Sequence, residues 1–256
     1  MMFACVLAVT ALVCFALRRG IHRYPAALYL CAVALDGAYA AAYLFGVPFW
    51  LWQPLFLLVQ KCYLSLALFA VVMYLGCLPR DSAASTWLRP VRAELSIAAC
   101  LLAAGHMAAY LGTYVSMAFS GALKGNVALA FVVAMALLIL LLVLGITSAQ
   151  RVKRLMTAER WLAVQRWSYV FFGLVYAHVA LMLAPAAFRG GASAQESLAV
   201  YTAVFGVYAV ARIARALADR REAAGEAGAA LAEATDPPSA SRVPALGDEW
   251  EESPVA

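Results

Sequence analysis

The chain has 256 residues, of which 66% are hydrophobic and only 13% charged, and its mean hydropathy is +0.84. These values are typical of integral membrane proteins and exclude an ordinary soluble globular domain. Membrane spans of roughly 20 residues each would use most of the chain, which leaves no room for a large soluble catalytic domain. The sequence has no nucleotide-binding motif, and we expect no nucleic-acid partner.

Apolar runs between helix breakers and charge clusters predict seven membrane-spanning helices. In chain order they cover residues 2–17, 26–45, 54–77, 94–116, 126–147, 162–184 and 197–218. No basic segment precedes the first run, and its arginines follow it at Arg18, Arg19 and Arg23. We therefore expect a retained helix there rather than a cleaved signal peptide.

Basic residues gather in alternate loops, which predicts the orientation of the helices because cytoplasmic loops carry an excess of Lys and Arg. The cytoplasmic set is Arg18, Arg19, Arg23, Arg80, Arg89, Arg92, Arg151, Lys153, Arg154, Arg160, Arg212, Arg215, Arg220 and Arg221. The remaining loops hold only Lys124 and Arg189. The predicted fold is an all-α bundle of about seven transmembrane helices, with the N-terminus outside and the C-terminus in the cytoplasm.

The end of the chain differs from the rest in charge. Residues 1–218 carry 16 basic and 5 acidic side chains, whereas residues 219–256 carry 3 basic and 9 acidic ones. This Ala-, Gly-, Pro- and Glu-rich segment predicts a disordered, acidic cytoplasmic tail. A solubilising role is favoured over a docking segment around Trp250.

Two histidines, His106 and His178, lie deep inside separate apolar runs. Both predicted helices run outward, and the two side chains lie about 18–21 Å beyond basic residues at the cytoplasmic ends, at 1.5 Å per residue. Neutral imidazoles at equal depth can ligate one metal from opposite sides, as a b-type haem requires. The small residues around His106 (Ala103, Ala104, Gly105 and Ala108) leave room for a porphyrin edge. The alternative is that each imidazole bonds a carbonyl or a tyrosine and only packs helices.

The sequence also resembles the ferric reductase-like transmembrane domain. This family includes ferric reductases, NADPH oxidases and the haem-binding membrane subunit of the periplasmic methionine sulfoxide reductase system. The resemblance lies in segments 147–151, 161–169 and 176–178, together with segment 88–95 followed by His106. It covers residues 54–218 and divides the chain into two N-terminal helices (1–53), a five-helix haem-binding core (54–218) and the tail (219–256).

The resemblance implies one b-type haem in the outer half of the membrane, with His106 and His178 as its axial ligands. The family's inner ligand pair is missing, because the corresponding positions fall at Gln165 and around Arg92. The resemblance also implies a separate redox partner protein or a membrane quinol as electron donor, since the family's flavin and nicotinamide domain has no counterpart in this sequence.

Two further charges, Asp36 and Lys61, fall within predicted spans and need a partner or a cavity. We predict an intramembrane ion pair between them that fixes helix packing, in preference to a proton path or quinone site. Lys61 could alternatively bind a haem propionate.

His22 is predicted to be a solvated loop residue. The alternative is that His22 and Gln165 form an inner-side site for a flavin or quinone head group.

Together these features predict a membrane b-type cytochrome, the electron-transfer subunit of a ferric reductase-like oxidoreductase. It would pass electrons from a quinol or cytoplasmic reductase to an extracytoplasmic metal ion or partner reductase. The alternatives are a haem-free transporter with Asp36 and Lys61 on its path, an accessory membrane protein or an assembly factor. The Arg-rich usage with only three lysines indicates a high-GC bacterium, and therefore a multi-pass protein in contact with the lipid of the cell membrane.

Overall fold

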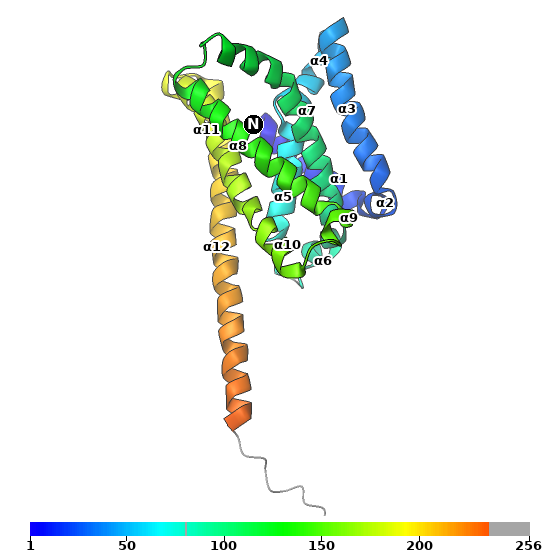
Figure 1. Cartoon of the computed structure of the whole chain (residues 1–256), viewed down its shortest axis with the longest axis vertical. Coiled ribbons are helices and arrows are strands. Elements are labelled where there is room, and N and C mark those ends of the chain that lie inside the picture. The colour runs from blue at the N-terminus through cyan, green and yellow to red at the C-terminus, as the bar shows by residue number, and fades with distance from the viewer. Residues whose placement is uncertain (80, 236–256) are drawn as a thin grey trace, which may run out of the picture. The chain divides into compact units, whose positions relative to one another are not determined.

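The computed structural model describes residues 1–79 and 81–235, and within that range it is helical without strands (Figure 1). The elements in chain order are α1 (Met2–Ala16), α2 (Arg18–Arg23), α3 (Pro25–Phe45), α4 (Phe49–Leu55), the π-helix η1 (Phe56–Gln60), α5 (Tyr63–Leu75), α6 (Ala83–Leu88), the 3₁₀-helix η2 (Arg89–Val91), α7 (Arg92–Phe119), α8 (Gly125–Ser148), α9 (Gln150–Lys153), α10 (Ala158–Gln165), α11 (Trp167–Phe188) and α12 (Ala192–Thr235). The predicted all-helical class is confirmed.

Several of the described helices are long and apolar enough to cross a membrane. Five meet this condition, and a sixth is added when the two helices of segment 49–75 count as one bent span. The remaining apolar helix, α1, has 15 residues and is shorter than a typical span. The structure is therefore that of a membrane protein, while the number of seven spans and the orientation of the termini stay predictions.

Local sequence explains where several helices begin and end. The hydroxyls of Ser82 and Thr157 accept hydrogen bonds from the backbone of the first turns of α6 and α10, as N-caps do. Helix α3 ends at Gly46, whose φ of 73° is accessible to glycine at little cost. Pro48 is then the N-cap residue of α4.

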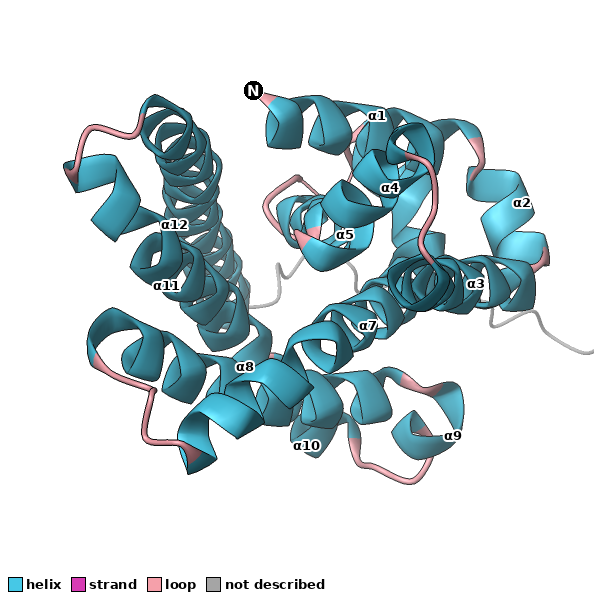
Figure 2. Ribbon diagram, turned by 90° about the horizontal axis from the view of Figure 1, so that it is seen from above, coloured by secondary structure: helices cyan, strands magenta, loops and turns pink. Residues whose placement is uncertain are grey.

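The first unit of the chain, residues 1–213, is built around α7. Figure 2 shows α7 between its neighbours, and it packs against α3, α5 and α8, while α1 packs on α5 and α11 on α8. Small residues of α7, Ala98 and Ala99, are almost completely buried and allow this close approach. A cluster of apolar side chains joins α5 and α11 to Tyr201, Phe205 and Tyr208 of α12.

The chain divides into two compact units, 1–213 and 214–256, while the predicted division by function stays a prediction. The boundary after residue 53 falls inside α4, and residues 1–213 form one unit. In the second unit, residues 214–256, helix α12 continues to Thr235, so the part of the predicted disordered tail from 219 to 235 is helical. The reason is local, because Ala, Glu and Arg are among the best helix formers and Arg215 pairs with Asp219 at 2.7 Å across one turn. The rest of the predicted tail lies outside the described residues.

Candidate functional site

His106 on α7 and His178 on α11 line the same cavity. The cavity has a volume of about 980 Å³ and is walled by α5, α7, α8, α11 and the start of α12, together with segment 53–62. That volume is at the upper end of the range of roughly 300–1,000 Å³ in which small-molecule and cofactor sites fall. Two residues that are 72 positions apart in the chain (178 minus 106) therefore line one cavity.

Each imidazole is held by a backbone carbonyl through the same ring nitrogen. His106 Nδ1 lies 2.8 Å from the carbonyl oxygen of Gln60, and His178 Nδ1 lies 3.1 Å from that of Ala130. A carbonyl only accepts hydrogen bonds, so Nδ1 carries the proton and donates in both residues. The lone pair of each neutral imidazole is then on Nε2.

This arrangement matches the way in which proteins prepare histidine ligands. A ligating His usually donates its other N–H to a carbonyl or carboxylate, which fixes the ring and its tautomer. No hydrogen bond joins either Nε2 to the residues that the structure describes. The carbonyl bonds also fit the alternative of packing histidines, which differs only in leaving Nε2 without a ligand.

The carbonyl that accepts the hydrogen bond from His106 lies at a break between two helices. The π-helix Phe56–Gln60 ends at Lys61, Cys62 adopts a left-handed conformation with φ of 59°, and α5 then starts at an angle of 42° to the preceding helix. A helix end leaves backbone carbonyls without partners inside the helix. The side-chain oxygen of Gln60 accepts a bond of 2.9 Å from the Tyr39 hydroxyl, which anchors this turn.

The wall next to His106 is made of small residues, as predicted. Ala103, Ala104 and Ala108 line the cavity. Gly105 faces the other way, toward α3, where the Asp36 carboxylate occupies the space in which a Cβ would stand. The glycine therefore allows a close approach of α3 and α7 rather than access to the cavity.

Aromatic residues beyond His106 form a part of the wall that was not predicted. The rings of His106 and Tyr110 meet edge to face at 5.2 Å, Tyr110 and Tyr114 are 6.0 Å apart, and Tyr114 stacks on Phe131 at 5.9 Å. All four residues line the cavity. The available signal was the spacing of four residues from His106 to Tyr110 to Tyr114, which puts them on one helix face.

The predicted ion pair between Asp36 and Lys61 is not formed. Oδ1 of Asp36 is buried and has no hydrogen-bond partner in the part of the chain that the structure describes. The Lys61 ammonium lies 5.3 Å from the centre of the Phe56 ring and lines the cavity. The two charges belong to neighbouring segments but point to different neighbours, α7 for Asp36 and the cavity for Lys61.

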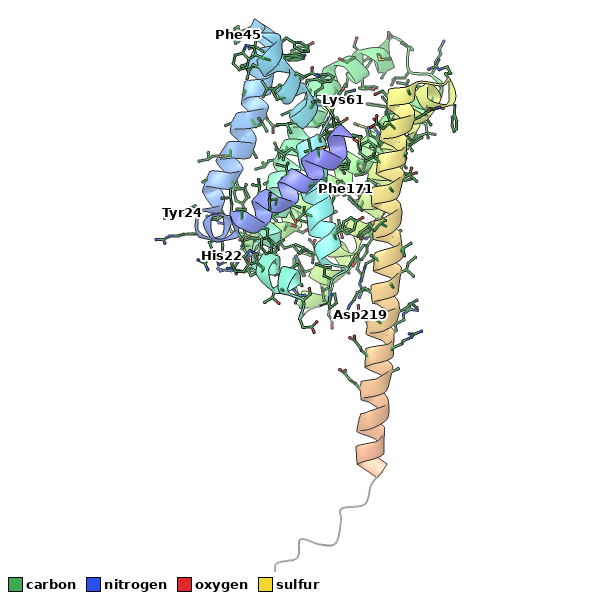
Figure 3. All side chains as sticks on the ribbon, turned by 180° about the vertical axis from the view of Figure 1, so that it is seen from behind. His22, Tyr24, Phe45, Lys61, Phe171 and Asp219 are labelled. Atoms are coloured by element: carbon green, nitrogen blue, oxygen red, sulfur yellow. The ribbon has the colours of Figure 1, made fainter. Side chains whose placement is uncertain are left out.

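The other predicted pair, His22 and Gln165, is not brought together. His22 is exposed on α2, near the junction with α3 (Figure 3), and α2 packs on α3 and η2. The side-chain amide of Gln165 donates to the Thr147 hydroxyl at 3.1 Å, on the contact between α10 and α8. Neither residue lines the cavity. The exposure of His22 agrees with the favoured interpretation as a solvated residue.

An all-protein metal site is not found within residues 1–79 and 81–235, because no three His, Cys, Asp or Glu side chains gather there. A haem requires only two axial ligands from the protein, since the porphyrin supplies the other four. Two neutral imidazoles whose residues line one largely apolar cavity fit that requirement as a donor set.

Comparison with known proteins adds no function. An uncharacterized protein of Treponema pallidum (strain Nichols) is 33% identical over 234 residues, which cover 88% of this chain and 63% of that protein. The chain thus spans less than two thirds of that relative. No protein-family model matches the chain, and no solved structure is similar to it. The resemblance to the ferric reductase-like domain stays a prediction.

Proposed function

We propose that this protein is a membrane b-type cytochrome subunit in which His106 and His178 hold one haem. The observation that carries the proposal is the matched state of the two imidazoles: each donates Nδ1–H to a backbone carbonyl, which leaves the lone pair on Nε2, and both residues line the same cavity. Histidines that only pack helices would need one hydrogen bond each, and nothing would require them to line the same cavity of about 980 Å³.

The bound haem would supply one-electron transfer, from a quinol or a separate cytoplasmic reductase to an extracytoplasmic metal ion or partner reductase. The residues of the chain do the rest. The Gln60 and Ala130 carbonyls orient the two rings and raise the basicity of Nε2. Leu137, Leu141, Phe171 and Val175 contribute to the apolar lining of the cavity.

The proposal is tested by haem content. The wild type and the variants His106→Ala, His178→Ala and His22→Ala would be purified in detergent from haem-replete cells, and haem per chain measured as the pyridine haemochrome. We expect close to one haem per chain in the wild type and in His22→Ala, and a large loss in the other two. His22 is a matched control because it is exposed and lies outside the cavity. A haem-free wild type, or equal haem in all four proteins, would refute the proposal.

A further inference from the structure

Lys61 is the one charged side chain among the residues that line the cavity, since the two histidines there are neutral. It stands at the break between η1 and α5, next to Gln60, whose carbonyl holds His106. In Figure 3 Lys61 lies at a height between Phe45 and Phe171. The lysine and the first candidate ligand are thus positioned by the same turn.

The ammonium of Lys61 lacks an anionic partner. No salt bridge to Lys61 exists among residues 1–79 and 81–235, and no Asp or Glu lines the cavity. Its described neighbour is the Phe56 ring, at 5.3 Å. A cation within a membrane span is costly, and such residues face a partner or a water-filled cavity. The contact with Phe56 stabilises a cation by only about 0.5–2 kcal/mol.

Snorkelling to the membrane surface would be the ordinary escape for a lysine near the end of a span. Lys61 lies near the middle of segment Phe49–Leu75, at its bend, where its side chain is exposed and lines the cavity. Its backbone N–H is fixed by the Phe56 carbonyl at 2.8 Å, so the start of the side chain is held at the cavity. The charge and the apolar walls around it together fit a ligand that is mostly apolar and carries a carboxylate.

We infer that Lys61 is an anion-binding residue of this cavity and takes a carboxylate of the bound ligand, which is a propionate of the haem. The inference rests on the proposed function for the identity of the ligand, and it adds the polar contact that sets which edge of the porphyrin faces Lys61. An ammonium donates charge-assisted hydrogen bonds to a carboxylate, and these are stronger than bonds between neutral groups.

The test compares haemin with haemin dimethyl ester, which has the same ring but no free carboxylate. Each is titrated by absorption into protein from haem-depleted cells, reconstituted in nanodiscs of neutral lipid so that no lipid headgroup offers a net negative charge. We expect the wild type to bind haemin at least about tenfold more tightly than the ester, a difference equivalent to about 1.4 kcal/mol. Lys61→Gln should weaken haemin binding to the level of the ester and leave ester binding unchanged. Lys61→Arg should keep most of the preference.

The matched control is Lys124→Gln, which removes a lysine outside the cavity and should leave both affinities unchanged. A preference for haemin that survives in Lys61→Gln would overturn the inference, and so would an equal loss of both affinities, which indicates a structural role. In either case a haem spectrum that depends on His106 and His178 would leave the proposed function standing. If the wild type binds neither porphyrin, the proposed function fails and the inference fails with it.

Discussion

Gly105 lies on α7 beside the candidate ligand His106, at a close contact with the Asp36 side chain of α3. A Cβ placed on Gly105 would meet three atoms of the Asp36 carboxylate, all of them closer than the 3.0 Å that real Cβ atoms respect. No other atom is as near, so the obstacle is a single side chain. Gly105→Ala must therefore turn the Asp36 side chain or move α3 away from α7.

The expected change in the free energy of unfolding combines opposing effects. Overpacking of a tight contact costs about 1–3 kcal/mol, while replacing glycine by alanine inside a helix contributes about 0.8–1.0 kcal/mol of stability. The single variant should therefore be destabilised by up to about 2 kcal/mol. In an Asp36→Ala background the obstacle is gone, and Gly105→Ala should be stabilising by up to about 1 kcal/mol. The coupling between the two changes is then about 1–3 kcal/mol, as found for residues in contact.

Unfolding of the four proteins in mixed micelles, followed by far-ultraviolet circular dichroism, measures this cycle. Gly112→Ala is the matched control, because Gly112 lies on the same helix and nothing lies within 4 Å of a Cβ placed there. It should be neutral or slightly stabilising in both backgrounds. Equal effects of Gly105→Ala with and without the Asp36 carboxylate would refute the packing of α3 on α7 described above.

Two further predictions concern the turn before α5 and its packing on α7. Cys62 has a φ of 59°, a conformation that costs an L-residue roughly 1–2 kcal/mol and suits a β-branched residue least. Cys62→Val should therefore unfold at a lower denaturant concentration than Cys62→Gly. The reverse order would contradict the observed backbone conformation. The buried Ser65 hydroxyl donates to the Ala99 carbonyl at 2.8 Å and links α5 to α7. Ser65→Ala should lower the unfolding free energy by about 0.6–1 kcal/mol, as for other interhelical bonds in membrane proteins. Ser96→Ala is the control, because it is the same substitution but removes a hydrogen bond within one helix.

The helices themselves could be predicted because long apolar runs are explicit in the sequence. Predicted and observed ends differ mostly by a few residues, for example 126–147 against Gly125–Ser148. The break at 56–62 could not be predicted with the same rules, because the apolar run continues through it. Pro54 and the polar pair Gln60 and Lys61 were the only local hints of a bend.

The candidate site was predicted in part. Its two histidines stand out in the sequence because they are polar residues in apolar runs, and the structure places both on one cavity. Their hydrogen-bond partners are backbone carbonyls, which every residue has, so no residue type marks Gln60 or Ala130 for that role. The Asp36–Lys61 pair was expected from similar depth alone. Depth does not determine which face of a helix a side chain occupies, and here Gly105 admits Asp36 on the far side of α7 from the cavity.

The central claim, that His106 and His178 bind one haem iron from opposite faces, is tested most directly by a reduced-minus-oxidised absorption spectrum of the purified wild type, recorded with and without carbon monoxide. We predict a b-type α band that carbon monoxide leaves unchanged, because both axial positions are occupied by imidazole. A wild type without haem, or an α band that persists in the double variant His106→Ala/His178→Ala, would contradict the claim.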